Sequence, residues 1–196
     1  MNFSPRINEA IKLACHLHRY QTRKDNLRTP YVSHLFGVAV LISSVTDDED
    51  TIIGGLMHDS LEDVKGYTYK KLVEDCGQEV ADIVTFVTEP LDANKPESDQ
   101  LPWLERKQQY LENLKKGGLK SALISAADKI HNTESFLFDA KKEGEDFTNR
   151  FGSSLRNKVW FHEQVLEIVA EKIGEESALV VRLRLCTEEF RKLLRD

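Results

Sequence analysis

The sequence predicts an all-α fold, a single bundle of about eight to ten helices. Two observations favour this class. Apolar residues recur at intervals of three and four along most of the chain, as on the buried faces of helices. No segment shows sustained alternation of apolar and polar residues between hairpin turns, and the one ambiguous run, residues 84–88, continues a helical pattern. With no internal repeat and no marked domain boundary, we expect residues 1–196 to form one domain.

The first three helices follow from their capping residues and apolar spacing. Ser4 and the proline after it suit the start of a helix over residues 5 to about 20. Ser33 is expected to cap a second helix, which carries His34 in its first turn. The acidic run 47–50 is expected to begin a third helix, because negative charge is favourable at a helix N-terminus.

The second half of the chain continues with helices and two polar loops. We expect helices over residues 67–76, 78–88, 102–116, 119 to about 136, 155–173 and from 177 onward. The segment 89–102 holds three prolines, and a loop of this length in a compact domain is often functional. Residues 141–154 are expected to form the second loop. The helix from residue 119 is apolar on several sides, which predicts a central position.

Composition and charge exclude some classes of protein. The chain is 40% hydrophobic and 31% charged, as in ordinary soluble globular proteins. A net charge of −6 argues against a nucleic-acid partner, although a small anionic ligand is compatible with local cations. Three scattered cysteines without a C-x-x-C pair indicate reduced thiols and a cytoplasmic location. We expect no membrane association, since no run approaches the roughly 20 apolar residues that a spanning helix needs and no signal segment is visible.

One short stretch concentrates groups that prefer water or a cation within an apolar segment. It contains His58 and Asp59 side by side, followed by Glu62 and Asp63. On a continuous helix, His58 would lie one turn before Glu62, and Asp59 one turn before Asp63. Such a dipeptide is most often part of a solvated acidic surface. The surrounding apolar residues favour a functional interpretation here.

Four residues stand out as polar groups embedded in apolar helical segments: His34, His58, Asp59 and Asp128. Buried charge is costly unless it is paired or bound to a metal, and two imidazoles with two carboxylates suit a divalent ion. Each has an alternative, because a lone helix histidine is often structural and Asp128 could bond Lys129. Three separate segments must each present such a residue, which favours the metal site.

The order and spacing of these residues resemble the HD superfamily of metal-dependent phosphohydrolases. Finer features resemble the hydrolase domain of RelA/SpoT proteins and the stand-alone small alarmone hydrolases of the metazoan SpoT homologue type. The motifs that carry the resemblance are Arg23-Lys24-Asp25, Thr29-Pro30-Tyr31-x-x-His34, His58-Asp59-x-x-Glu62-Asp63 and Ala127-Asp128-Lys129-x-x-Asn132. The resemblance runs from the first helix to about residue 170, so we expect an HD hydrolase domain with its motif-bearing core over residues 5–170.

The resemblance implies hydrolysis of the 3′-pyrophosphate of guanosine tetra- or pentaphosphate (ppGpp or pppGpp), giving GDP or GTP and pyrophosphate, with Mn²⁺ in the site. The four polar residues named above would hold the metal. Glu62 and Asp63 would orient and deprotonate the attacking water, as general bases do. The nucleotide and its phosphates would contact Arg23, Lys24, Arg106, Lys107 and Asn132. The expected partner is thus a small phosphorylated nucleotide, and nothing indicates an oligomeric state.

The chain departs from the family after Asn132. Alarmone hydrolases usually continue with a leucine and an arginine, whereas this chain has Thr133-Glu134, which places a carboxylate near a pocket for phosphates. Two alternatives therefore stay open. One is a phosphohydrolase of another nucleotide, such as the 2′-phosphate of NADPH, which would release orthophosphate. The other is a non-catalytic module that senses a nucleotide. Trp160-Phe161 could form a pocket wall, but core packing is the commoner role of such residues.

Overall fold

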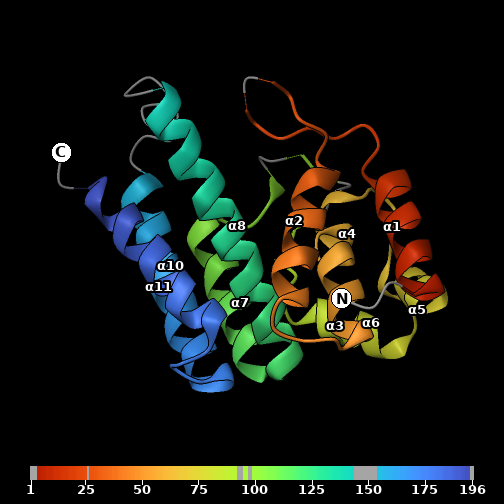
Figure 1. The fold of residues 1–196 in the computed structure, drawn as a ribbon. Coiled ribbons are helices and arrows are strands. Elements are labelled where there is room, and N and C mark those ends of the chain that lie inside the picture. Colours follow the sequence, from red (N-terminus) through yellow and green to blue (C-terminus); the bar gives the residue numbers. More distant parts are fainter. Residues whose placement is uncertain (1–3, 26, 92–94, 97–98, 144–153, 195–196) are drawn as a thin grey trace.

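A computed structural model of the chain describes residues 4–25, 27–91, 95–96, 99–143 and 154–194 (Figure 1). In these residues the backbone forms helices joined by turns and loops, and the only extended pairing is an isolated bridge between Thr22 and Pro30. The helices are α1 (Pro5–Leu17), α2 (Val32–Ser43), α3 (Glu49–Met57), α4 (Ser60–Asp63), α5 (Tyr69–Cys76), α6 (Gln78–Thr85), α7 (Trp103–Lys116), α8 (Leu119–Glu143), α10 (Ser154–Ile173) and α11 (Ala178–Lys192). The all-α prediction is confirmed.

Capping residues set the starts of α1 and α3 as the sequence predicts. The Ser4 hydroxyl accepts a hydrogen bond from the Ile7 N–H at 3.1 Å. The Asp48 carboxylate accepts one from the Thr51 N–H at 2.9 Å. Each bond satisfies a backbone donor that has no partner within its helix. Gly77 separates α5 from α6 with a φ of 96°, a backbone conformation that residues with a Cβ rarely adopt.

Several expected boundaries are wrong, among them the start of α5 at Tyr69 rather than residue 67 and the end of α6 at Thr85 rather than residue 88. Ser33 does not cap α2, because the helix already begins at Val32 and no side chain caps it. The central helix continues to Glu143, beyond the expected end near residue 136. The expected loop over 141–154 therefore begins later, and residues 144–153 lie outside the described part.

The chain does not run through His58-Asp59 as one continuous helix. α3 ends at Met57, the two residues form a turn, and α4 begins at Ser60. The expected alignment of His58 with Glu62 along a single helix is therefore wrong. The turn has a local cause, because the His58 Nδ1 donates to the Gly55 carbonyl at 2.8 Å and holds the ring against the last turn of α3.

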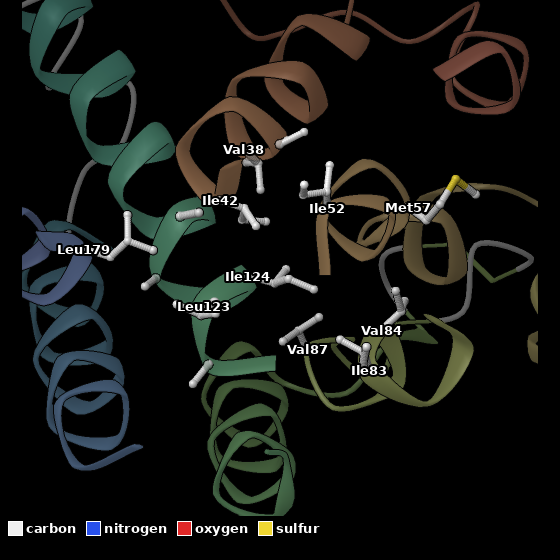
Figure 2. Close-up of a cluster of buried hydrophobic side chains, with 14 of the residues drawn as sticks. Val38, Ile42, Ile52, Met57, Ile83, Val84, Val87, Leu123, Ile124 and Leu179 are labelled. Atoms are coloured by element: carbon white, nitrogen blue, oxygen red, sulfur yellow. The ribbon is translucent and has the colours of Figure 1, made fainter. Parts of the chain in front are cut away.

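Helix α8 lies at the centre of the molecule, as its apolar pattern predicts. It packs against α2, α3 and α6 on one side and against α7, α10 and α11 on the other (Figure 1). Figure 2 shows Ile124 of α8 among buried residues of α2, α3 and α6. A Cβ on Gly54 of α3 would lie 2.7 Å from Ile124 Cδ1, so this glycine permits the close approach of α3 to α8. No helix in the described residues is both long and apolar enough to cross a lipid bilayer.

Candidate metal centre

Three parts of the fold bring two histidines and two aspartates to one point. His34 comes from the first turn of α2, His58 and Asp59 from the turn after α3, and Asp128 from the middle of α8. The His34 Nε2 lies 3.6 Å from Asp59 Oδ2 and 3.2 Å from Asp128 Oδ1. The His58 Nε2 lies 3.2 Å and 3.7 Å from the same two oxygens. Ligand atoms of His34, His58 and Asp59 all lie within 4.8 Å of one another, which is close enough to share one ion.

The histidine geometry fits a bound cation. Because the Gly55 carbonyl only accepts hydrogen bonds, the His58 Nδ1 must carry the proton, and in the neutral ring Nε2 keeps its lone pair. That Nε2 is buried and makes no hydrogen bond, although it lies near two carboxylate oxygens. Imidazole nitrogens with carboxylate oxygens are a donor set for divalent transition metals. The residues present therefore fit a divalent ion.

The charges around this point favour a cation. Burial opposes ionisation of Asp128, but Lys129 and the two imidazoles hold the pKa of Asp128 well below its usual range. Burial also lowers the pKa of His58, yet the carboxylates of Asp59 and Asp128 outweigh it and raise that pKa to about 9. Asn132 donates to Asp128 Oδ1 at 2.5 Å, and Lys129 bonds the other oxygen. The two carboxylates thus favour positive charge at His58, whereas burial is the larger effect at His34 and lowers its pKa.

Tyr31 is a site residue to which the sequence assigned no role. Its hydroxyl donates to Asp59 Oδ2 at 2.7 Å. Burial and the Asp59 carboxylate raise the pKa of Tyr31 well above its usual value, so the phenol keeps its proton and remains a donor. The T-P-Y-x-x-H spacing could have identified Tyr31 as a site residue, because it places Tyr31 one helical turn before His34.

The two carboxylates expected to act on water lie in α4, directly after the turn. The Glu62 carboxylate accepts a hydrogen bond from the Glu89 N–H. Burial, followed by the charges of Asp59 and Asp63, raises the pKa of Glu62 well above its usual value. Burial and the Asp59 carboxylate raise the pKa of Asp63 to about 6. Both groups therefore hold protons more tightly than free carboxylates do, which suits general bases near neutral pH.

A pocket of about 930 Å³ lies beside these residues. Its lining includes three of the residues expected to bind the nucleotide, Arg23, Lys24 and Asn132, together with Tyr31 and Asp63. The Arg23 guanidinium donates to Asn132 Oδ1 at 2.9 Å, so a cation is fixed next to the residue that bonds Asp128. This volume is in the range of small-molecule sites.

Arg106 and Lys107 lie on α7, and neither is among the residues that line this pocket. The Lys107 Nζ bonds the Glu89 carboxylate and lies 4.5 Å from the centroid of the Phe161 ring. Burial lowers the pKa of Lys107 to about 7. The Arg106 Nε is buried without a hydrogen-bond partner. Lys107 thus acts on the surroundings of Glu62, and direct contact of the two cations with substrate stays a prediction.

The structure explains the unusual Thr133-Glu134 pair. Glu134 forms two hydrogen bonds with Arg182 of α11, from Nε at 2.6 Å and from Nη2 at 2.7 Å. Thr133 is buried and its hydroxyl lies 3.1 Å from the His162 Nδ1. The carboxylate that the sequence places near the phosphates is therefore already paired with a cation.

Trp160 and Phe161 contribute to packing. Phe161 is buried in the main core and lies edge-on to Tyr110, with ring centroids 5.4 Å apart. Trp160 is half-buried and packs on the same core. Neither is among the residues that line the pocket, so core packing, the commoner of the two expected roles, is the one observed.

The described residues form an all-helical fold in which two histidines and two aspartates make a candidate metal site. The chain matches the family model described as HD domain over residues 10–148, which is more than half of its length. The chain belongs to the HD-domain family, and this confirms the family expected from its motifs.

The curated relatives that resemble the chain include enzymes named as guanosine-3′,5′-bis(diphosphate) 3′-pyrophosphohydrolases. The guanosine-3′,5′-bis(diphosphate) 3′-pyrophosphohydrolase MESH1 of Xenopus tropicalis is 34% identical over 128 residues, which cover 64% of this chain and 66% of the relative. MESH1 of Drosophila melanogaster is 31% identical over 131 residues, covering 66% and 68%. The chain therefore aligns with about two thirds of these relatives' length.

Two further matches extend over nearly the whole chain. The bifunctional (p)ppGpp synthase/hydrolase SpoT of Escherichia coli (strain K12) is 27% identical over 192 residues, which cover 93% of this chain and 26% of SpoT. A solved structure of a metazoan SpoT orthologue that hydrolyses ppGpp has a TM-score of 0.74 and 24% identity, and the match covers 96% of this chain and 97% of that one. The structural match establishes the shared fold.

Proposed function

We propose that the chain is a metal-dependent phosphohydrolase that removes the 3′-pyrophosphate of ppGpp or pppGpp, giving GDP or GTP and pyrophosphate. One observation carries the proposal: His34, His58, Asp59 and Asp128 converge beside a pocket that is lined by cations. Relatives that bear this activity in their names support the choice of substrate.

The four converging residues would hold a divalent ion, for which we propose Mn²⁺. When bound, such an ion polarises a phosphoryl oxygen and lowers the pKa of a water molecule. Glu62 takes the proton that the water loses as it attacks phosphorus, and the Glu89 N–H fixes the orientation of that carboxylate. The ribose 3′ oxygen leaves with a proton from solvent. Asp63, at the edge of the pocket, orients the same water.

The pocket residues would hold the nucleotide. Arg23 and Lys24 present cations to it, and Asn132 holds the Arg23 guanidinium in place. Charge-assisted hydrogen bonds to phosphate are among the strongest polar contacts in proteins. Because Glu134 is paired with Arg182, its carboxylate does not leave uncompensated negative charge at the pocket.

A nucleotide panel assayed in the presence of Mn²⁺ tests the substrate. We expect ppGpp to yield GDP and pyrophosphate, and chelation with EDTA to stop the reaction. Orthophosphate released from NADPH, without turnover of ppGpp, would instead establish the alternative phosphohydrolase. Tight nucleotide binding without turnover of any compound would identify a sensing module.

Two variants test the roles of the site residues. Asp128→Ala is expected to lose the metal, whereas Glu62→Ala is expected to retain it and lose turnover, because the Glu62 carboxylate is held by the Glu89 N–H and is not one of the four proposed ligands. Metal content after gel filtration and initial rates separate the two effects. Normal turnover by Glu62→Ala would show that another group accepts the proton.

A further inference from the structure

We propose that His131 is a positioning residue for His34, and that Gly37 exists in α2 to admit its ring. The inference rests on the proposed metal centre. In this arrangement His131 accepts a hydrogen bond from one nitrogen of His34, so that the other nitrogen of His34 presents its lone pair to the ion. Metal-binding histidines need such a partner to fix both ring orientation and the position of the proton.

The first support is the contact between the two rings. The His34 Nδ1 lies 3.0 Å from the His131 Nδ1, and one of the two nitrogens must donate. The opposite nitrogen of His34, Nε2, faces the carboxylates of Asp59 and Asp128. A metal on Nε2 requires the proton of His34 to be on Nδ1, and His131 must then be the acceptor.

Further contacts are compatible with this assignment. The Ser135 hydroxyl lies 3.5 Å from the same Nδ1 of His131, so this contact is longer than that of His34 and competes only weakly for the single lone pair of the nitrogen. The rings of His34 and His131 are also edge-on, with centroids 4.8 Å apart and an interplanar angle of 66°. His34 is 1% exposed, so its Nδ1 has no access to bulk water as a substitute partner.

The third support is the space that His131 occupies. A Cβ built on Gly37 would lie 2.2 Å from His131 Cδ2 and 2.3 Å from His131 Nε2, so even alanine at this position would collide with the ring. Glycine in the interior of a helix costs about 1 kcal/mol relative to alanine. Gly37 follows His34 by one helical turn, so α2 presents a metal ligand and the notch for its supporting ring on the same face.

Helix α8, which faces α2, also carries a proposed metal ligand and a supporting residue on one face. His131 follows Asp128 by three residues in α8, so one face of that helix carries a metal ligand and the partner of another ligand. Contact between α2 and α8 therefore sets the ligand distances and the tautomer of His34 together. The sequence contained a signal for this pair, a glycine inside an apolar helix, but did not identify its partner.

Mn²⁺ binding to the metal-free protein tests the inference without a substrate. We expect His131→Leu, which lacks an acceptor, to weaken Mn²⁺ binding by about 10- to 100-fold, the usual effect of losing such a partner. His131→Asn places an amide oxygen near the position of Nδ1 and should bind nearly as well as the wild type. Free Mn²⁺ is measured by electron paramagnetic resonance, and unfolding midpoints in EDTA are compared in parallel.

Gly37→Ala provides an independent variant. Its methyl group should displace the His131 ring and weaken Mn²⁺ binding to a similar extent. Combining it with His131→Asn, whose side chain is shorter, should restore part of the affinity. If His131→Leu fails to fold, the Mn²⁺ affinities of Gly37→Ala and of the double variant test the inference in its place.

Matched variants separate the possible failures. His162→Asn alters another buried histidine that contacts α8, and it should change stability while leaving Mn²⁺ affinity unchanged. Wild-type Mn²⁺ affinity in both His131→Leu and Gly37→Ala would overturn the inference. If His34→Ala also bound Mn²⁺ normally, the proposed metal centre itself would be wrong. Loss of binding in His34→Ala alone would leave the centre intact and reject only the role of His131.

Discussion

At the residue scale, the environment of Glu62 is set by residues distant in the sequence. The Glu89 N–H bonds the Glu62 carboxylate, and the Glu89 side chain is held by Lys107. The nearby Lys107 charge also opposes the rise in the pKa of Glu62 that burial and the neighbouring carboxylates cause. Lys107 therefore influences both the position and the protonation of the proposed base.

Lys107→Met should shift the pH dependence of turnover. Removing the cation favours the neutral form of Glu62, so the pKa of Glu62 rises and less of the base is ionised at low pH. We expect the acid limb of the kcat/KM profile to move to higher pH, with a smaller change in rate above it. Lys107→Arg, which keeps the charge, is the matched control. An unchanged acid limb in Lys107→Met would contradict this assignment.

The pairing of Glu134 with Arg182 also makes a residue-scale prediction. In Arg182→Met the Glu134 carboxylate loses its partner and repels an anionic substrate, so KM should rise while kcat changes little. Both side chains are substantially exposed, at 48% and 40%, so the free energy of unfolding should change by less than about 1 kcal/mol. Steady-state kinetics and urea unfolding measure the two effects. A restored KM in Arg182→Met combined with Glu134→Gln would identify the unpaired charge as the cause.

At the element scale, local signals predicted helix starts better than helix breaks. Ser4, Asp48 and Gly77 mark boundaries through caps and backbone conformation that are encoded within a few residues. The break at His58-Asp59 was missed because the same residues also fit an uninterrupted helix, and the choice depends on how the ring packs on α3.

A buried histidine, His162, lies at the contact between α8 and α10, with its Nδ1 3.1 Å from the Thr133 hydroxyl. Burial lowers the pKa of His162 from 6.5 to about 3, so between these values the unfolded chain binds more protons than the folded protein. The contribution of this group to stability is present above pH 6.5 and is lost as the pH falls toward 3. One pH unit below 6.5, the free energy of unfolding should fall by about 1 kcal/mol through His162 alone.

Urea unfolding at several pH values checks this linkage. His162→Asn lacks the titrating group and should show a shallower fall in stability between pH 6.5 and 3 than the wild type. Subtracting the free energy of unfolding of the variant from that of the wild type at each pH cancels the contribution of the other titrating groups. Equal slopes would show that His162 does not remain neutral in the folded state.

At the scale of the whole molecule, the sequence predicted the proposed ligands but not the contacts that support them. His34, His58, Asp59 and Asp128 were visible as polar residues in apolar segments, and the structure brings all four together. The contacts made by Tyr31, Glu89 and His131 each join residues at least 27 positions apart, so they depend on how the helices pack. That the chain forms a single domain remains a prediction.

The proposed ion should stabilise the entire fold, because its ligands come from α2, from the turn after α3 and from the central helix α8. These segments meet only in the folded protein, so the ion binds the native state and not the unfolded chain. At a free Mn²⁺ concentration of 100 times Kd, the free energy of unfolding should increase by about 2.7 kcal/mol. Denaturant unfolding with Mn²⁺ and with EDTA measures this increment.

Asp59→Asn is the matched variant for this measurement. It removes one charged ligand but keeps an oxygen that can accept the Tyr31 hydrogen bond. For each protein, the free energy of unfolding in EDTA is subtracted from that in Mn²⁺, which cancels the direct effect of the substitution on folding. We expect the increment to fall sharply in the variant at the same Mn²⁺ concentration, because weaker binding reduces the gain through mass action. A full increment in Asp59→Asn would mean that the stabilising ion binds elsewhere, since this carboxylate lies between the two imidazoles.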